Sequence, residues 1–283
     1  MAGTVVAHYV RPDGLDSTLS PRPFLHPVTT LAGTVVTDAL PADHRWHLGL
    51  GVAIADVGGV NLWGGRTYVR DVGYTWLDDH GRVEQRALLE RSPSAVTAEL
   101  AWLGPDARPL LHELREMAAE PVPAAVLPQA WRLRFRFTLR NVTLAPLSLG
   151  SPGSNGREGG GYGGFFWRLA PFTRIAVRTP DATGETQVHG RPAPWLAVQG
   201  QVGADRTEVT LVFVGADERT RRDPWFVRLA GYPGVGSSLA PHRPVLLEPG
   251  DSLTRGIDVL VADGAPDADR LTAAVDRGAP SWT

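Results

Sequence analysis

The chain has 283 residues, no cysteine and no lysine, and a formal net charge of −2 at pH 7. This balance leaves no basic surface for a phosphate backbone, so we expect no nucleic-acid partner. The missing residue types exclude disulfides, thiolate nucleophiles, Schiff-base lysines and the lysine of a phosphate-binding P-loop.

The distribution of turn-forming residues bounds the architecture. The 32 glycines and 24 prolines are spread along the chain, and turn signals recur about every eight to twelve residues, as in β-sandwiches and barrels. We therefore expect one all-β domain over residues 1–283, a large antiparallel β-sandwich with few short helices. No apolar stretch is long enough for a membrane-spanning helix and residues 1–14 lack signal-peptide blocks, which predicts a cytoplasmic protein without a membrane partner.

Strict alternation marks the best strand candidates. In residues 131–140 apolar and arginine side chains alternate, which predicts that one face of the strand packs in the core and the other faces solvent. Residues 108–119 also fit helical spacing, but the neighbouring turns favour a strand. Gly58-Gly59 predicts a two-residue hairpin turn, and an acidic first turn predicts a short helix over residues 266–277. Similar patterns predict strands over residues 173–179, 208–215 and 252–264.

Residues 159–164 contain the pattern G-x-G-x-x-G. A dinucleotide site needs a strand directly before this pattern and a helix directly after it, and the flanking sequences predict neither. We interpret the segment as a loop whose backbone can approach a ligand closely, with Glu158, Tyr162 and Arg168 as its chemically active side chains. The alternative is a solvated, turn-rich crossover.

Residues 41–57 (PADHRWHLGLGVAIADV) place two of the eight histidines, His44 and His47, at the start of a predicted strand. If the strand begins near His47, this residue shares a face with glycine and alanine only, which packs closely against another layer or leaves room for a ligand. A spacing of three puts the imidazoles on opposite faces of a regular strand. Both can therefore reach one site only if residues 41–45 form a loop.

Two imidazoles admit two kinds of chemistry. They can act as general acid and base near neutral pH, or they can bind a divalent metal such as zinc. A metal site needs a further ligand, for which His26, Asp43 and Glu158 are the candidates. A third interpretation gives one of the two histidines a purely structural role.

Aromatic and arginine residues recur in two other segments. Residues 61–68 supply Asn61, Trp63, Arg66 and Tyr68, and residues 223–232 supply Trp225, Arg228 and Tyr232. An aromatic ring can stack on the C–H face of a sugar while guanidinium and amide groups bind its hydroxyls. These residues are sugar-binding candidates, although tryptophans are more often part of a core.

Four segments resemble a bacterial family of unknown function, the PmoA-like family. They are residues 22–65 (RPFLHPVTTLAGTVVTDALPADHRWHLGLGVAIADVGGVNLWGG), 162–169 (YGGFFWRL), 223–232 (DPWFVRLAGY) and 247–264 (LEPGDSLTRGIDVLVADG). The first block is the most specific. The family's name comes from a subunit of a membrane-bound methane monooxygenase, and it implies no function for a chain without a predicted membrane span.

Residues 137–153 (FTLRNVTLAPLSLGSPG) and 249–253 resemble sandwiches of the galactose-mutarotase type. That resemblance implies a supersandwich with a cleft on one concave sheet face, where an imidazole and a carboxylate act on a sugar. Mutarotases carry a histidine shortly after the asparagine-containing strand, whereas residues 148–166 contain none. The resemblance thus implies that any imidazole chemistry comes from residues 26–47. The family pattern also has a histidine where this chain has Trp46, which weakens a tri-histidine metal site.

The leading hypothesis is a carbohydrate-processing enzyme without a cofactor, an epimerase, lyase or hydrolase acting on a sugar or glycoside. His44 and His47 are the expected general acid and base, and Glu158 is their carboxylate partner. The alternatives are a non-catalytic sugar-binding module and an enzyme with a histidine-bound divalent metal. The expected substrate-binding residues are His26, Asn61, Trp63, Arg66, Tyr162, Arg168, Trp225 and Arg228.

Overall fold

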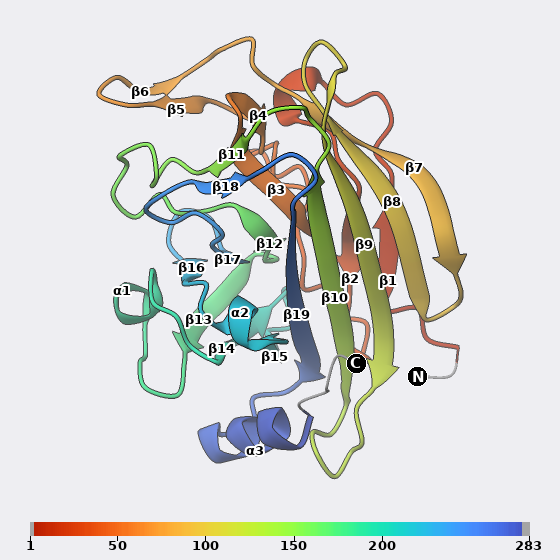
Figure 1. The fold of residues 1–283 in the computed structure, drawn as a ribbon. Coiled ribbons are helices and arrows are strands. Elements are labelled where there is room, and N and C mark those ends of the chain that lie inside the picture. The colour runs from red at the N-terminus through yellow and green to blue at the C-terminus, as the bar shows by residue number, and fades with distance from the viewer. Residues whose placement is uncertain (1–2, 279–283) are drawn as a thin grey trace.

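Two antiparallel β-sheets pack face to face in the computed structural model, which describes residues 3–278 (Figure 1). The first sheet has the strand order β1-β2-β3-β12-β17-β16, and β4, β11 and β18 join it through β3. Its strands are β1 (Ala7–Val10), β2 (Phe24–Val28), β3 (Leu50–Val57), β4 (Val60–Leu62), β11 (Leu147–Gly150), β12 (Gly164–Arg168), β16 (Trp225–Arg228), β17 (Gly234–Ser237) and β18 (Val245–Leu247).

The second sheet has the order β13-β14-β15-β19-β10-β9-β8-β7 and contains the longest strands. Its strands are β7 (Arg82–Arg91), β8 (Ala95–Leu103), β9 (Pro109–Pro121), β10 (Ala130–Asn141), β13 (Phe172–Arg178), β14 (Trp195–Val202), β15 (Thr207–Gly215) and β19 (Ser252–Asp263). A separate hairpin of β5 (Thr67–Val69) and β6 (Gly73–Thr75) projects from the body of the molecule (Figure 1). The helices are short: α1 (Glu185–Val188), α2 (Glu218–Arg221), α3 (Ala268–Gly278) and the 3-10 turn Ser17–Leu19.

The predicted fold class, an antiparallel β-sandwich with few short helices, is confirmed. Residues 108–119 form a strand and not a helix, since they lie within β9 between β8 and β10. The glycine pair of the predicted turn joins β3 to β4 with φ angles of 58° and 86°, a left-handed conformation that glycine adopts without strain. The predicted terminal helix corresponds to α3.

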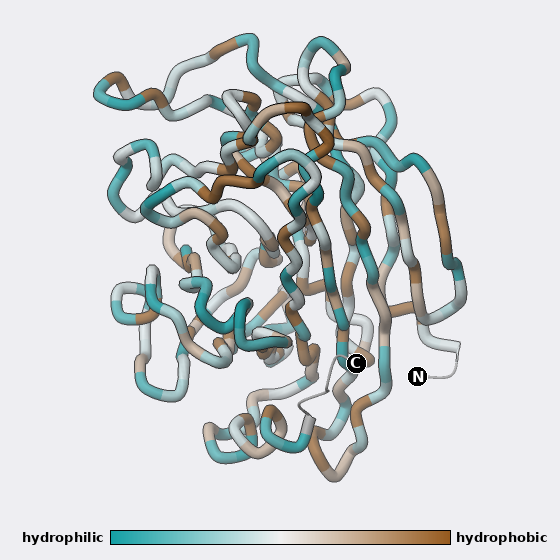
Figure 2. The backbone as a smooth tube through the Cα atoms, viewed as in Figure 1, coloured by the Kyte–Doolittle hydropathy of each residue, from teal (hydrophilic) through white to brown (hydrophobic). Residues whose placement is uncertain are grey.

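Alternating side chains build the core between the sheets. Phe135 and Phe137 of β10 are buried in the core cluster that both sheets share, and the ring centroid of Phe135 lies 5.4 Å from that of Phe165 in the first sheet. The arginines that alternate with them face outward. Figure 2 shows the resulting alternation of hydrophobic and hydrophilic residues along the long strands of the second sheet. On the outer face of that sheet, Leu271 and Ala274 of α3 cover a second apolar cluster.

A charged pair lies inside the core between the sheets. The side chains of Glu113 and Arg115 on β9 are fully buried, and Arg115 Nε donates to Glu113 Oε1 at 2.7 Å. Trp102 Nε1 donates to the other carboxylate oxygen, and Arg115 Nη1 donates to the backbone carbonyl of Pro23 in the first sheet's lead-in segment. The pair therefore links the two halves of the sandwich.

Removing one partner of this pair should be strongly destabilising. Glu113→Ala leaves the Arg115 guanidinium buried without its counter-charge, and we expect the free energy of unfolding in urea to fall by about 3–5 kcal/mol. The control Glu218→Gln breaks a solvent-exposed pair with Arg222, for which a change within about 0.5 kcal/mol is expected. Similar losses for both variants would contradict this role of the buried pair.

Candidate functional site

The outer face of β3 is covered by aromatic rings. Leu50, Val52 and Ile54 point into the core between the sheets, and Ala53 and Ala55 point the other way. The small side chains of this outer face leave room for rings from four separate segments. We call these rings the aromatic cluster: Trp46, Trp63, Tyr162, Phe166 and Phe226.

Two consecutive turns bring His44 and His47 together beside this cluster. The amide of His44 donates to the carbonyl of Pro41, and the amide of His47 donates to the carbonyl of His44. Residues 41–47 are therefore a loop, and β3 begins at Leu50 and not at His47. The two imidazoles, which we call the histidine pair, are stacked with ring centroids 4.8 Å apart.

Hydrogen bonds to the histidine pair fix where each ring carries its proton. His44 Nδ1 lies 2.9 Å from Asp43 Oδ2, and an ionised carboxylate only accepts, so Nδ1 of His44 is the donor. Arg168 Nη1 lies 3.3 Å from His47 Nδ1, and a guanidinium only donates, so Nδ1 of His47 is the acceptor. When both rings are neutral, His44 Nε2 thus offers a lone pair and His47 Nε2 carries a proton.

Arg168 supplies a buried positive charge to the site. Its side chain is 5% exposed, and Nη2 lies 3.3 Å from Asp43 and 3.9 Å from Asp38. Its guanidinium also lies 5.5 Å from the ring centroid of Tyr232. The charge is balanced by two carboxylates that remain partly exposed, so the polar edge of the site is accessible while its arginine is not.

Burial determines the protonation of His47. The residue is 1% exposed and is surrounded by rings, among them Phe166 and Tyr232 at centroid distances of 5.1 and 5.0 Å. This burial, together with the nearby charges of His44 and Arg168, holds its pKa well below the usual range. His47 is therefore neutral at pH 7. Burial also raises the pKa of Tyr232 to about 12, so this phenol keeps its proton.

A buried arginine holds the loops that carry these rings. Arg22 is 3% exposed and donates to four backbone carbonyls, those of Leu19, Ser20, Trp46 and Trp63. Burial and the positive charge of Arg115 lower its pKa to about 9, which leaves it charged at pH 7. The guanidinium therefore joins the turn of the histidine pair to the segment of Trp63.

A glycine next to this segment permits close contact with Trp46. Gly65 has a φ of +71°, and a Cβ placed there would lie 2.7 Å from carbons of the Trp46 ring. Any other residue would push the indole away and strain the backbone. The glycine of the tryptophan-glycine sequence 63–65 thus allows the Trp46 ring to pack directly against the backbone.

The structure brings several of the predicted site residues together and separates others. Trp63 and Tyr162 belong to the aromatic cluster, in which Trp63 contacts His47, and Arg168 donates to His47 Nδ1. His26 is half-buried, with Nδ1 bonded to Thr37 Oγ1, and its pKa is lowered by burial against the opposing effect of Asp38.

Other predicted site residues have structural surroundings. The Asn61 amide is fully engaged, since it donates to Gly65 O and Thr67 Oγ1 and accepts from two backbone amides. Trp225 belongs to the core between the sheets, where Nε1 donates to Ala193 O. These environments favour roles in shaping the fold for both residues.

The remaining predicted residues differ in their distance from the site. Arg228 contacts the aromatic cluster, with its guanidinium 5.2 Å from the ring centroid of Phe226, and it also donates to Gly159 O in the glycine-rich loop 151–163 and pairs with Glu185. Arg66 is exposed and packs on Trp76, 5.9 Å from the indole centroid. Glu158 is exposed on the glycine-rich loop. The carboxylate bonded to His44 belongs to Asp43, not to Glu158.

Sequence reasoning missed several residues of the site. Asp43 was considered only as a metal ligand, although its position next to His44 allows the bond that orients this ring. Phe166 and Arg22 carry no local signal, since long-range contacts alone bring them to the site. The sequence names Tyr232 among the aromatic residues of 223–232, but not as a contact of the two imidazoles.

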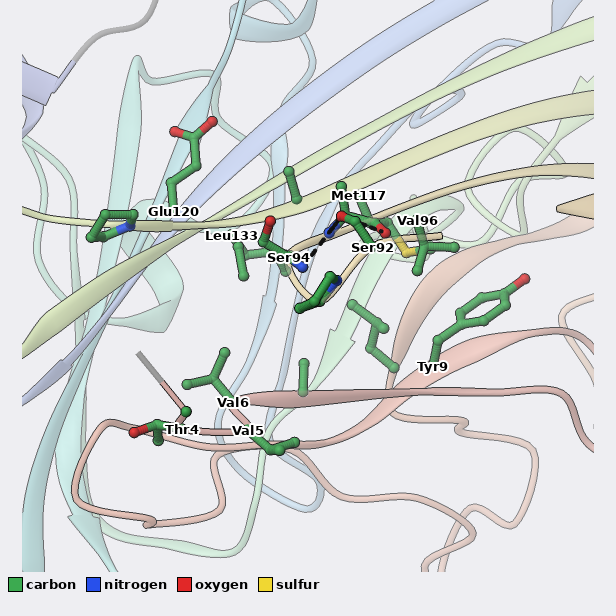
Figure 3. Close-up of a pocket in the computed structure, with 18 residues that line it drawn as sticks. Thr4, Val5, Val6, Tyr9, Ser92, Ser94, Val96, Met117, Glu120 and Leu133 are labelled. Atoms are coloured by element: carbon green, nitrogen blue, oxygen red, sulfur yellow. Dashed lines mark hydrogen bonds between the residues drawn. The ribbon is translucent and has the colours of Figure 1, made fainter. Parts of the chain in front are cut away.

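A cavity of about 680 Å³ lies elsewhere, between β1 and the β8–β9 region (Figure 3). Its lining is mainly aliphatic and includes Val5, Val6, Val96, Met117 and Leu133. Figure 3 shows the Tyr9 ring at one end of it, with its hydroxyl directed away from the other lining residues. None of the predicted site residues lines this cavity.

Two further searches cover residues 3–278. Within this range, no group of three or more His, Cys, Asp or Glu side chains is arranged to hold a metal ion. No helix in the same range has the length and apolar character required to cross a membrane.

The comparisons with known proteins give one family match. A family model described as "Family of unknown function (DUF6807)" matches residues 1–276. No curated protein sequence matches the chain.

Two solved structures are similar to parts of this fold. One is a polysaccharide lyase, with 12% identity and a TM-score of 0.34 over 90% of this chain and 32% of the lyase. The other is a variant of the GH36 α-galactosidase AgaA from Geobacillus stearothermophilus in complex with 1-deoxygalactonojirimycin, with 13% identity and a TM-score of 0.32 over 85% of this chain and 36% of that protein. The chain thus spans about a third of each, and such TM-scores determine neither its fold nor its activity.

The buried imidazole of His47 should affect how stability depends on pH. Its folded pKa lies below the unfolded value of 6.5, so protons bind preferentially to the unfolded chain. Its stabilising contribution is complete above about pH 6.5 and is lost as the pH falls toward the folded pKa. We expect the free energy of unfolding of His47→Gln, measured in urea at pH 7.5 and 5.5, to decrease less than that of the wild type, by up to about 1.4 kcal/mol per pH unit.

His242→Gln is the matched control, because His242 is exposed and is hydrated in both states. This variant should show the wild-type dependence on pH. A wild-type dependence for His47→Gln as well would contradict the burial of a neutral imidazole.

Proposed function

The chain belongs to a family of unknown function (DUF6807), and we propose that it is a carbohydrate-processing enzyme whose histidine pair supplies a general base and a general acid. The observation that carries this proposal is the opposite hydrogen bonding of the two rings: Asp43 accepts from His44 Nδ1, and Arg168 donates to His47 Nδ1. Nε2 of His44 can therefore accept a proton, and Nε2 of His47 can donate one.

The two histidines have distinct roles in this mechanism. His44 Nε2, which has the lone pair, removes a proton from a hydroxyl or an acidic C–H group of the sugar. His47 Nε2–H donates a hydrogen bond, and finally its proton, to an oxygen on which negative charge develops. The charge of Arg168 stabilises the resulting imidazolate, which regains a proton from the His44 imidazolium through solvent, so that both rings return to their neutral forms. Because burial lowers the pKa of His47, its neutral ring is available for donation at pH 7, and the aromatic cluster keeps the surrounding dielectric low.

The surroundings of the histidine pair favour a sugar as the substrate. Trp46 is half-buried with its ring centroid 5.1 Å from that of His44, and Tyr232 lies at 4.4 Å from the same imidazole. Such rings can stack on the C–H face of a pyranose. Asp38 and Asp43 are partly exposed beside them and can accept hydrogen bonds from sugar hydroxyls.

Access to His47 requires movement of Tyr232. This ring contacts both imidazoles and belongs to the loop 229–233, in which Gly231 is exposed with a φ of +81°. We propose that the substrate displaces Tyr232 and occupies the space above the histidine pair. His44, with 29% of its side chain exposed, is reached first.

Asp43 is the carboxylate that we assign as the partner of His44. It orients the ring, holds the proton on Nδ1 and stabilises the imidazolium formed when Nε2 accepts a proton. Burial opposes its ionisation, but the hydrogen bond from His44 and the charge of Arg168 together hold the pKa of Asp43 below its usual value. The carboxylate is therefore ionised at neutral pH, as this role requires.

One observation favours a second candidate function, a non-catalytic sugar-binding module. His47 is buried beneath aromatic rings, which is also the environment of a structural histidine. In such a module the same aromatic and acidic surface holds a sugar without any proton transfer.

Substitution of the histidine pair separates the two functions. We expect His44→Gln and His47→Gln to lower kcat/KM by about 10²–10⁴ on any glycoside that the wild type converts, because each removes one proton-transfer group. Product formation from a panel of sugars and glycosides, followed by mass spectrometry, is the measurement. The melting temperature of His44→Gln should stay within a few degrees of the wild type, since this side chain is partly exposed.

The variant His242→Gln removes an exposed imidazole and should retain full turnover. Sugar binding without any product from the wild type would support the module and contradict the enzyme.

A further inference from the structure

An exposed tryptophan lies immediately after the projecting hairpin of β5 and β6. The Trp76 side chain is 52% exposed, which is unusual for a residue whose burial is as favourable as that of an indole. Two neighbouring side chains contact the indole ring. Arg66 lies over it at 5.9 Å from the centroid, and the buried His80 ring lies at 6.2 Å.

The support beneath Trp76 continues to the histidine pair. His80 Nε2 is 2.7 Å from the carbonyl of Gly65, and Gly65 packs against the ring of Trp46. Trp46 in turn contacts His44. The exposed indole is therefore joined to the proposed catalytic site through a short series of rigid contacts.

Tyr74 on β6 is a second exposed aromatic ring that packs against an arginine. Tyr74 is 39% exposed, and the guanidinium of Arg157 lies 5.3 Å from its centroid. Its hydroxyl lies 3.0 Å from the hydroxyl of Tyr162, which belongs to the aromatic cluster. Two ring–arginine pairs thus lie at this hairpin, one on β6 and one directly after it, and both are connected to the site around His47.

The arginines of these pairs keep hydrogen-bonding capacity. Among residues 3–278, no carboxylate lies within ion-pair distance of Arg66 or Arg157, and both are held against rings instead. A guanidinium beside an aromatic face offers donors to hydroxyls while the ring offers stacking area. This combination suits a sugar ring.

We propose that Trp76 and Arg66 form an outer sugar subsite, so that the substrate is a glycan chain and not a free monosaccharide. This inference rests on the proposed function, because it places one ring of the chain over the histidine pair and further rings along the hairpin. Arg66, predicted from the sequence as a sugar-binding residue, has its role at this outer position.

The test measures binding by calorimetry in a His44→Gln background, which prevents turnover. The probes are linear hexasaccharides of glucose (β-1,4 and α-1,4), xylose, mannose, N-acetylglucosamine and galacturonic acid, together with their parent monosaccharides. We expect at least one hexasaccharide to bind at least tenfold more tightly than its monosaccharide. Adding Trp76→Ala should raise the Kd of that hexasaccharide about tenfold and leave that of the monosaccharide unchanged.

Two further variants make the result specific. Trp76→Phe keeps a stacking ring and should restore most of the affinity, and Arg66→Gln should weaken hexasaccharide binding in the same direction as Trp76→Ala. Leu77→Ala, which removes an apolar side chain of 40% exposure next to Trp76, is the matched control and should bind as the parent does.

An unchanged hexasaccharide Kd in the Trp76→Ala variant, or the absence of binding by every hexasaccharide, would overturn the outer subsite. This failure can be told apart from failure of the proposed function. Turnover of a monosaccharide by the wild type with no effect of Trp76 would leave the histidine mechanism intact. Trp76-dependent binding of a chain that the wild type never converts would leave the subsite and remove the enzyme.

Discussion

A guanidinium donates hydrogen bonds and cannot accept them, and the proton positions of this site depend on that constraint at Arg168. Its Nη1 faces His47 Nδ1, and its Nη2 faces the Asp43 carboxylate that also bonds His44. One buried positive charge therefore assigns the acceptor nitrogen of one imidazole directly and steadies the carboxylate that assigns the donor nitrogen of the other. Without it, His47 Nδ1 would lose the donor that sets its tautomer, and Asp43 alone would set that of His44.

The scaffold makes this arrangement rigid. Arg22 ties the turn that carries the histidine pair to the Trp63 segment by donating to carbonyls on both. The small side chains on the outer face of β3 allow the aromatic cluster to lie directly over the strand. Since these rings exclude water, the charge of Arg168 acts through a medium of low dielectric, and the same exclusion keeps His47 neutral. Electrostatics and packing thus have one cause, the placement of rings above a strand of small residues.

Periodicity was a sound guide wherever the pattern was long. The alternation in residues 131–140 gave the correct inner face of β10, and the small-residue face of β3 was assigned correctly because eight residues fix the phase of the strand. Short strands gave no such guidance. Trp225 begins the four-residue strand β16, and the phase of that strand sends its ring into the core between the sheets, whereas the sequence suggested a ligand contact.

Contacts between segments that are distant in the chain could not be predicted from the sequence. The loop around His44 could be anticipated from the spacing of its histidines, but its carboxylate could not. The sequence favoured Glu158 as the carboxylate partner, whereas Asp43 Oδ2 lies 2.9 Å from His44 Nδ1. Asn61 carries an amide of the kind that binds sugar hydroxyls, yet this amide is already hydrogen-bonded to neighbouring backbone groups. Residue type alone does not reveal whether a polar group is already satisfied.

Long-range ¹H–¹⁵N NMR of the histidine side chains in the wild type at pH 7.5, with assignment by His44→Gln and His47→Gln, observes the proton positions of the histidine pair. The hydrogen bonds from Arg168 and to Asp43 predict opposite neutral tautomers, with the proton on Nδ1 of His44 and on Nε2 of His47. Observation of the same tautomer for both rings, or of a doubly protonated His47 at this pH, would contradict this assignment.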